Sequence, residues 1–240
     1  MSSGAITDKG LLRKINQDSY LLIDDDKVVF GAVCDGIGGG NAGEIASMLA
    51  CDELKNHYHQ YAPKRENVIN WLNEAVDKAN DKVFIEGLNN EKYRGMGTTL
   101  VGFLVIEDSS FVINVGDSRC YVIDQNDNMH LITKDHTLFN DLLAKGNMDE
   151  ETISKFVTKN IISKAIGITH GIKPDIFEIN NNDYQTLMLC SDGLSSYVDK
   201  DFIKEVLLTD LTIEEKCTHL VAKANENGGY DNITIVIYQR

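Results

Sequence analysis

The sequence is poor in proline and in basic residues, and it has no long hydrophobic run. Only two of its 240 residues are proline, and no segment has the biased composition of a linker. No stretch reaches the roughly 18 consecutive apolar residues of a membrane helix. Residues 1–10 lack the basic and apolar regions of a signal peptide. These absences predict one continuous cytoplasmic domain over residues 1–240.

Basic residues and pairable cysteines are scarce as well. The chain has 23 Lys and Arg against 37 Asp and Glu, a net charge of -14, and a surface of that sign repels nucleic acid and anionic membranes. The five cysteines are an odd number without C-x-x-C spacing, which argues against a disulfide framework and a zinc knuckle. No cysteine is followed by Arg six positions later, so a C-x5-R nucleophile is missing too.

What the sequence does contain is a regular succession of β-rich and helical segments. Apolar runs at 19–23 and 28–34, split by three aspartates, predict a hairpin. Helical spacing of apolar residues predicts long amphipathic helices over 44–61 and 67–88. Four further β-rich runs are joined by turns too short for crossover helices, so we expect them to form an antiparallel meander. These runs are 99–107, 110–117, 119–125 and 129–133.

The second half of the chain completes this pattern. Residues 135–172 are more polar, and we expect short helices with a loop there. The segments that follow are expected as strands at 176–179, 186–190 and 232–238 and as helices at 200–208 and 212–226. Strands placed early, midway and late, with helices available for the outer faces, predict a layered α+β architecture rather than a doubly wound parallel sheet.

Five aspartates recur at or beside the predicted strands. They are Asp18, Asp35, Asp117, Asp192 and Asp231. An isolated carboxylate beside a buried strand is costly unless it is paired or binds a metal, and few basic residues stand near these five. Oxygen ligands without His or Cys nearby select Mg²⁺ or Mn²⁺ over zinc. The pattern therefore predicts a site for Mg²⁺ or Mn²⁺.

Two other interpretations of these segments stay open from the residues alone. Asp before Gly, as at Asp35 and Asp192, is common turn chemistry, which accounts for any one such aspartate without a metal. The Gly-rich residues 38–43 satisfy G-x-G-x-x-G, the dinucleotide fingerprint. That fingerprint needs a second parallel strand ending in an acid about 20 residues on, whereas here two helices intervene before any strand.

Arg13 and His136 are further candidates for the site. Arg13 lies five residues before Asp18, and an Arg near a metal site is a natural bidentate clamp for a phosphate. The alternative for Arg13 is an exposed charge beside Lys14. His136 follows Asp135 and is a candidate proton donor of lower rank, while the other five histidines have no ligand-type partners at suitable spacing and are interpreted as surface or structural residues.

Several blocks of the chain follow one another in the order known from one family. They are RKINQD at 13–18, VCDGIGGGNAGEIAS at 33–47, GTTL at 97–100, VGDSRCY at 115–121, DHT at 135–137, CSDGL at 190–194 and GGYDNITIVIY at 228–238. Together they resemble the metal-dependent Ser/Thr protein phosphatases of the PPM (PP2C) type, in their compact bacterial form. The resemblance covers nearly the whole chain.

The resemblance implies a four-layer α-β-β-α sandwich of two antiparallel sheets flanked by helices. It implies a single catalytic domain with a variable flap at about 135–172, and a two-metal centre at one end of the sandwich. The Gly-rich turn at 38–40 would pass close beside the metals. By this resemblance, Asp35 would bridge two ions, the Gly36 carbonyl would be a ligand, and Asp192 and Asp231 would complete the first ion. Asp18 would hold coordinated water, and Arg13 would clamp the substrate phosphate. Asp117 would bind a weaker third ion together with Asp192.

The implied reaction is hydrolysis of phosphoserine and phosphothreonine by direct attack of a metal-bridging hydroxide, with Mn²⁺ or Mg²⁺ as cofactor. Many eukaryotic relatives have a proton-donating His where this chain has Ile37, so the proton is assigned to a metal-bound water. Phosphorylated proteins, including a Ser/Thr kinase, are the expected partners, and the sequence carries no signal of an oligomeric state. The alternatives are a pseudophosphatase that only binds partners and a phosphatase of small phosphoesters.

Overall fold

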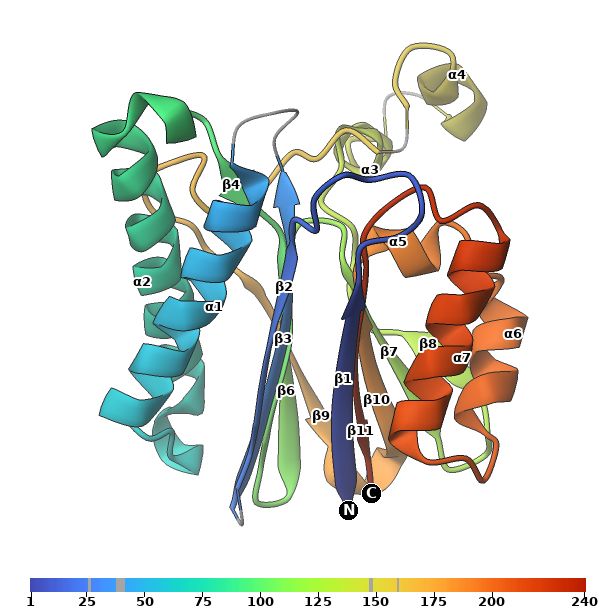
Figure 1. The fold of residues 1–240 in the computed structure, drawn as a ribbon. Helices are drawn as coiled ribbons and strands as arrows, with labels where there is room; N and C mark the ends of the chain where they lie inside the picture. Colours follow the sequence, from blue (N-terminus) through green and yellow to red (C-terminus); the bar gives the residue numbers. More distant parts are fainter. Residues whose placement is uncertain (26, 38–41, 147–148, 159) are drawn as a thin grey trace.

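The fold is a sandwich of two antiparallel sheets with helices on both outer faces (Figure 1). The computed structural model describes residues 1–25, 27–37, 42–146, 149–158 and 160–240. The first sheet has the order β1 (Ser2–Asp8), β11 (Ile233–Gln239), β10 (Tyr184–Cys190), β7 (Arg119–Asp124) and β8 (Met129–Leu131). The second has the order β2 (Asp18–Asp24), β3 (Val28–Ile37), β5 (Leu100–Ile106), β6 (Ser109–Val115) and β9 (Asp175–Asn180), with β4 (Gly97–Thr98) paired to β3.

The helices cover the two sheets from outside, which confirms the predicted α-β-β-α layering (Figure 1). The second sheet is covered by α1 (Gly43–Gln60) and α2 (Val68–Asn89), and the first by α5 (Asp192–Ser195), α6 (Lys200–Leu207) and α7 (Ile213–Glu226). Short 3-10 helices lie at Arg65–Asn67, Glu91–Tyr93 and Asn181–Asp183. All strand pairs of the described residues are antiparallel, which gives the dinucleotide interpretation no support.

Strand β3 explains how the layers are held together. Its side chains alternate between faces, because successive residues of a strand point to opposite sides. Phe30 and Cys34 pack against α1 and α2, whereas Val29 and Val33 pack in the core between the two sheets. Because β3 is buried on both faces, its sequence is a nearly continuous apolar run. Its last residues lie at one end of the sandwich.

The predicted meander is wrong in one respect. The runs at 99–107 and 110–117 pair as β5 and β6 in the second sheet, but those at 119–125 and 129–133 pair as β7 and β8 in the first sheet. The chain crosses between the sheets in the turn after β6, where Gly116 adopts a φ of +109° that favours glycine. Two hairpins joined by this crossing replace one meander. Strand β1, which was not predicted, pairs along its whole length with β11.

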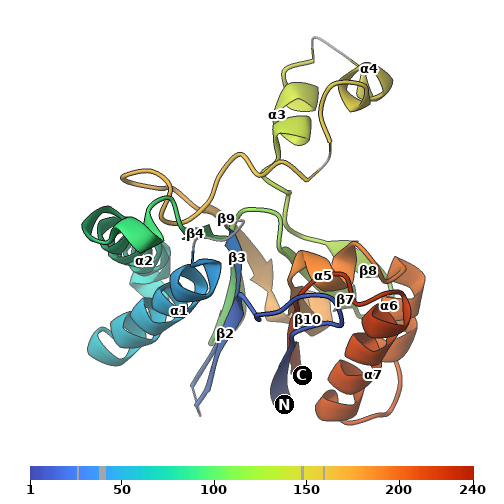
Figure 2. The same ribbon diagram turned by 45° about the horizontal axis from the view of Figure 1, so that its top comes forward.

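The polar segment 135–172 forms two short helices, as expected, and projects from the sandwich (Figure 2). They are α3 (Leu138–Ala144) and α4 (Glu150–Ser154). Thr137 forms a bridge with Ile162 where the segment leaves and rejoins the body. None of the helices in the described ranges is long and apolar enough to cross a membrane.

Candidate metal centre

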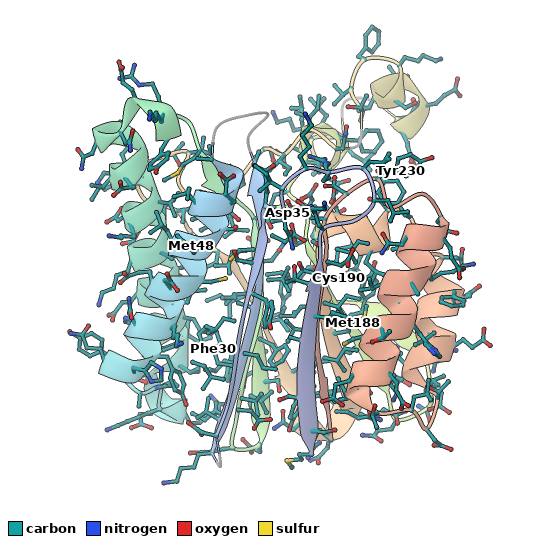
Figure 3. The ribbon with its side chains drawn as sticks, viewed as in Figure 1. Phe30, Asp35, Met48, Met188, Cys190 and Tyr230 are labelled. Carbon is teal, nitrogen blue, oxygen red and sulfur yellow. The ribbon has the colours of Figure 1, made fainter. Side chains whose placement is uncertain are left out.

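The β2–β3 hairpin places two carboxylates side by side. Asp18 begins β2 and is the register partner of Asp35 on β3. Figure 3 shows Asp35 at the end of the sandwich from which the flap projects. The backbone of Asp35 is fixed on both sides, because its N–H donates to Thr99 Oγ1 at 3.0 Å and its carbonyl accepts from the Thr99 N–H at 2.8 Å and from Thr98 Oγ1 at 2.9 Å.

The first sheet brings two more aspartates to the same end. Asp192 begins α5 directly after β10, and Asp231 lies just before β11. Ser191 joins the two sheets, because its hydroxyl donates to Asp18 Oδ2 at 2.7 Å and accepts from the Thr234 N–H at 3.0 Å. Residues 173 positions apart in the chain are thereby held in direct contact.

Burial and mutual repulsion raise the pKa values of this acid cluster. Burial, followed by the negative charges of the neighbouring aspartates, raises the pKa of Asp35 well above its usual range. Burial also raises the pKa of Asp18 to about 7, with added contributions from the charges of Asp192 and Asp231. The pKa of Asp192 is raised by its burial and by Asp231. Carboxylates that disfavour each other's charge in this way create a strong demand for a cation.

Three of the predicted aspartates have an oxygen without a hydrogen-bond partner among the described residues. Asp18, Asp117 and Asp192 each bury an unpaired Oδ1. Such oxygens are costly to bury, and they are the donors that a hard divalent cation prefers. Within the described ranges no three His, Cys, Asp or Glu side chains stand close enough together to hold one ion. The donor chemistry fits Mg²⁺ or Mn²⁺.

Asp117 lies in the turn between β6 and β7, at a cleft of about 440 Å³ that Asp192 also lines. Burial, together with the charges of Asp192 and Asp135, raises the pKa of Asp117 to about 7. The neighbouring Ser118 hydroxyl lies 2.8 Å from Thr99 Oγ1. Thr99 therefore contacts both the backbone of Asp35 and the turn that carries Asp117.

Gly36 occupies a position where a side chain would not fit. A Cβ there would stand 2.3 Å from the Gly43 carbonyl oxygen and 2.6 Å from that of Gln17. The Gly36 N–H donates to the Gln17 carbonyl at 3.0 Å, which fixes the strand beside Asp35. The glycines at 38–40, which we expected to turn beside the metals, lie outside the described residues.

Arg13 reaches the acid cluster from the loop between β1 and β2. Its Nη2 lies 2.6 Å from Asp231 Oδ2, and its Nε donates to the Tyr230 carbonyl at 3.3 Å. The side chain is 47% exposed, so part of the guanidinium faces solvent at the mouth of the site. The structure therefore brings Arg13 to the predicted acids rather than leaving it as an isolated surface charge.

Asn232 and Ser191 are site residues that the sequence did not single out. The Asn232 side chain accepts from the Gln17 N–H at 2.8 Å and donates to the carbonyls of Lys9 at 2.8 Å and Ile15 at 3.1 Å. It thus secures the loop that carries Arg13. Each of the two residues is next to a predicted aspartate in the sequence, and this adjacency could have indicated that they belong to the site.

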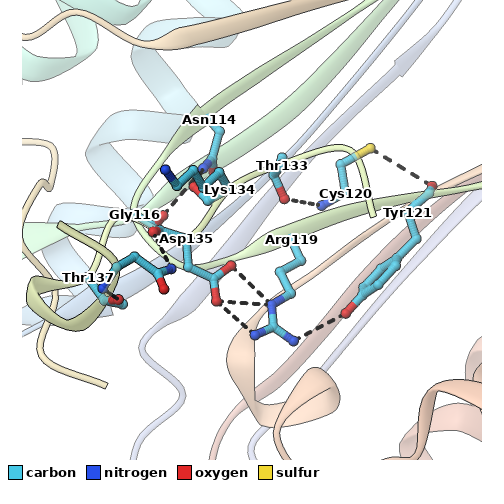
Figure 4. Close-up of polar contacts among 10 residues, drawn as sticks. Asn114, Gly116, Arg119, Cys120, Tyr121, Thr133, Lys134, Asp135 and Thr137 are labelled. Atoms are coloured by element: carbon cyan, nitrogen blue, oxygen red, sulfur yellow. Dashed lines mark hydrogen bonds and ion pairs between the residues drawn. The ribbon is translucent and has the colours of Figure 1, made fainter. Parts of the chain in front are cut away.

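Polar contacts also join the Asp117 turn to the flap (Figure 4). Arg119 donates to Asp135 through Nε and Nη2, at 3.1 and 2.7 Å, and to the Tyr121 hydroxyl through Nη1 at 3.3 Å. His136 has both ring nitrogens engaged, because Nδ1 accepts from the Gly116 N–H at 3.0 Å and Nε2 lies 3.2 Å from Asp175. These contacts argue against His136 as the proton donor.

Comparison with known proteins identifies the family. The family model described as protein phosphatase 2C matches residues 13–229. The chain belongs to the protein phosphatase 2C family. Among curated relatives of this PP2C member, the serine/threonine phosphatase stp of Listeria innocua is 34% identical over 237 residues, which are 98% of this chain and 94% of that protein. The protein phosphatase PhpP of Streptococcus pneumoniae is 32% identical over 241 residues, which are 99% of this chain and 96% of its own.

Solved structures of PP2C phosphatases share the fold. Serine/threonine phosphatase Stp1 from Staphylococcus aureus superposes with a TM-score of 0.90 at 34% identity, over 99% of this chain and 94% of that one. The catalytic domain of the phosphatase PstP, solved with two manganese ions, gives a TM-score of 0.82 at 30% identity, over 98% and 96% of the two chains. Membership of this family makes the present chain a metal-dependent phosphatase.

Proposed function

We propose that this PP2C member hydrolyses phosphoserine and phosphothreonine in proteins, with water as the nucleophile and without a phosphoenzyme. The observation that carries the proposal is the cluster of fully and partly buried aspartates that raise one another's pKa at one end of the sandwich. A pseudophosphatase and a phosphatase of small phosphoesters are not favoured, because the relatives are named serine/threonine phosphatases over nearly the full chain.

We assign the metal ligands to the acids that meet at this end. Asp35 would be shared between two ions, and the Gly36 carbonyl would be a further ligand. Asp192 and Asp231 would hold the first ion, and their positions at the ends of two neighbouring strands support that assignment. Asp18, held by Ser191 at 2.7 Å, would orient a water of the metal site.

The cofactor is assigned as Mn²⁺ or Mg²⁺, with two ions and a third of lower affinity. The chemistry that such ions supply when bound is acidification of a water and neutralisation of charge on the phosphate. The third ion is assigned to Asp117 with Asp192, since both line the same cleft and each has an unpaired buried oxygen among the described residues.

Arg13 is assigned as the clamp for the substrate phosphate. Its guanidinium lies beside Asp231 and is partly open to solvent, so it can present N–H groups to an arriving phosphate without leaving the site. A planar guanidinium binds phosphate through two hydrogen bonds. Asn232 keeps Arg13 in place through its bonds to the loop on either side.

The proposal covers residues 1–240 as one catalytic domain, with 135–172 as its flap. Phosphorylated proteins are the substrates, and a Ser/Thr kinase is proposed among them. A cytoplasmic location is part of the proposal, because all five cysteines are buried free thiols, as is usual in a reducing compartment.

The test is hydrolysis of a phosphothreonine peptide with Mn²⁺, with Mg²⁺ and with EDTA. We expect turnover with either cation, none with EDTA, and recovery when Mn²⁺ is restored in excess. A phosphotyrosine peptide and a small aryl phosphate serve as comparison substrates. Turnover of the peptide that persists under full chelation would contradict the metal-dependent mechanism.

A further inference from the structure

The turn that carries Asp117 is fastened to the base of the flap, which we define as residues 134–137 and 161–163. Within this base the Ser163 N–H donates to the His136 carbonyl at 2.9 Å, and the adjoining Leu138 N–H donates to the Ile161 carbonyl at 2.8 Å. The two chain segments that lead into and out of the flap are therefore held together. Any residue that joins this base to the Asp117 turn couples the flap to the metal centre.

His136 makes the first connection. Its N–H donates to the Gly116 carbonyl at 2.9 Å, and the Gly116 N–H donates back to His136 Nδ1 at 3.0 Å. Because Nδ1 accepts this bond, the ring hydrogen lies on Nε2, which faces Asp175 Oδ2 at 3.2 Å. One imidazole thus holds the turn on one side and β9 on the other. The His136 side chain is only 13% exposed, whereas the Asp175 carboxylate is 42% exposed and also lies 3.4 Å from Lys164 Nζ.

Arg119 makes the second connection, two residues after Asp117. Its Nε lies 3.1 and 3.2 Å from the two carboxylate oxygens of Asp135, and its Nη2 lies 2.7 Å from one of them. Figure 4 shows this ion pair bridging the start of β7 and the base of the flap. The planar fork of a guanidinium holds a carboxylate in one orientation, which a lysine ammonium does not.

We propose that His136 and Arg119 are positioning residues that set the place of the Asp117 carboxylate by tying its turn to the flap base. The inference rests on the proposed function, in which Asp117 ligates a weaker third ion. Neither residue touches the reacting atoms. The consequence is reciprocal: a substrate that displaces the flap base shifts Asp117, and an ion on Asp117 steadies the flap base.

Paired substitutions of His136 separate its two bonds. The Asn side-chain oxygen can take the place of Nδ1, so His136→Asn keeps the acceptor for Gly116 and loses the donor to Asp175. The Gln amide reaches the place of Nε2, so His136→Gln does the reverse, and His136→Ala loses both. His130→Ala is the matched control, because His130 also contacts a carboxylate, Asp124 at 2.9 Å, but belongs to β8 away from the flap base.

The readouts are calorimetric titration with Mn²⁺ and tryptic cleavage of the flap at Lys155 in the metal-free protein. For His136→Ala we expect the weakest Mn²⁺ event to lose roughly 10- to 100-fold in affinity, the range for residues that orient ligands, together with faster flap cleavage. His136→Asn should restore Mn²⁺ affinity more than flap protection, and His136→Gln should restore flap protection more than Mn²⁺ affinity. Arg119→Lys should weaken both, and His130→Ala neither.

Mn²⁺ affinity and flap cleavage indistinguishable from wild type in His136→Ala would overturn the coupling. Equal losses in the Ala, Asn and Gln variants would also overturn it, because they would indicate a general loss of packing. If the Ala variant does not fold, the contrast between Asn and Gln still decides. A wild-type protein without phosphatase activity would refute the proposed function, while the binding and cleavage measurements would still judge the coupling.

Discussion

The two ends of the β2–β3 hairpin carry aspartates in opposite chemical states. At the turn end, Asp25 accepts hydrogen bonds from the Tyr58 hydroxyl and from the N–H groups of Lys27 at 3.0 Å and Val28 at 2.8 Å, and these bonds lower its pKa. At the open end, burial and neighbouring aspartates raise the pKa values of Asp18 and Asp35. The same residue type is thus stabilised as an anion in the turn of this hairpin and destabilised as an anion at its open end.

This difference separates an acid with partners in the chain from the acids that we propose as metal ligands. The turn-end carboxylate obtains its partners from the chain itself, whereas the open end leaves buried oxygens for a ligand to satisfy. Cavity size does not make the distinction, because the turn end borders a cavity of about 930 Å³ and the open end a cleft of about 440 Å³. Buried carboxylate oxygens without a hydrogen-bond partner among the described residues are the better guide to the site.

Asp35→Asn should have the largest effect of the substitutions in this hairpin. A neutral amide cannot bridge two dications, so we expect kcat/KM for a phosphothreonine peptide to fall by more than about 100-fold, beyond the usual loss for residues that only orient ligands. The free energy of unfolding in EDTA should stay the same or rise, since one charge leaves a repulsive cluster. Appreciable turnover of a folded variant at saturating Mn²⁺ would remove Asp35 from the bridging role.

The two ends should also give opposite pH dependences of stability in the metal-free protein. The pKa of Asp18 is raised from 3.8 to about 7, so its contribution is present below about pH 4 and is lost as the pH rises through 7. Asp18 alone should lower the free energy of unfolding by on the order of 3 kcal/mol between pH 5 and 8. Asp35, Asp117 and Asp192, whose pKa values are also raised, should add to this decrease. Urea unfolding in EDTA measures the slope. Asp18→Asn should make the slope shallower, and a slope unchanged by that substitution would contradict the assignment.

Arg13→Ala tests the cation at the mouth of the open end. Loss of a charge-assisted, bidentate contact should lower kcat/KM for phosphopeptides, mainly by raising KM. The decrease should correspond to on the order of 2 to 3 kcal/mol of lost transition-state stabilisation. Arg13→Lys should recover only part of this loss, because an ammonium lacks the planar fork. Steady-state kinetics on one peptide decide the matter, and an Ala variant with wild-type parameters would return Arg13 to a surface role.

Asp117→Asn tests whether Asp117 acts as a metal ligand or only as a turn residue. A tight turn tolerates Asn well, so stability should change little. Loss of a ligand to a weak third ion should lower kcat by about 10-fold and leave the two tight ions bound. Calorimetric Mn²⁺ titration beside kinetics separates these outcomes, and an unchanged kcat across the Mn²⁺ range would leave Asp117 as a turn residue only.

Asp25→Asn is the matched change at the turn end, and its effect should be the smallest. The variant removes one carboxylate from the same hairpin, but we expect unchanged phosphatase kinetics and a loss of about 1 kcal/mol in unfolding free energy from weakened hydrogen bonds. Because the pKa of Asp25 is lowered, its contribution is present above about pH 4 and lost as the pH falls. A large loss of activity would show that the two ends are not independent.

The sequence contained enough local signal to predict the layers and the acids at the strand ends, but not their long-range partners. Asp18 and Asp35 flank one hairpin, so their proximity follows from a short turn. The Ser191 bond to Asp18 spans 173 positions, and no local pattern encodes a pairing of that length. The crossing at Gly116 was missed for a related reason, since a short polar turn can join two strands of one sheet or pass between two sheets.

The pairing of β1 with β11 has a consequence for biosynthesis. In the first sheet β1 contacts no described strand other than β11, and Asp231 lies just before that strand. A nascent chain on the ribosome therefore exposes Asp35 early but cannot assemble the acid cluster until residues 231–239 have emerged. Because β1 pairs with β11, the acid cluster should be completed only once residues 231–239 have left the ribosome, and a chain stalled before they emerge should stay inactive and protease-sensitive.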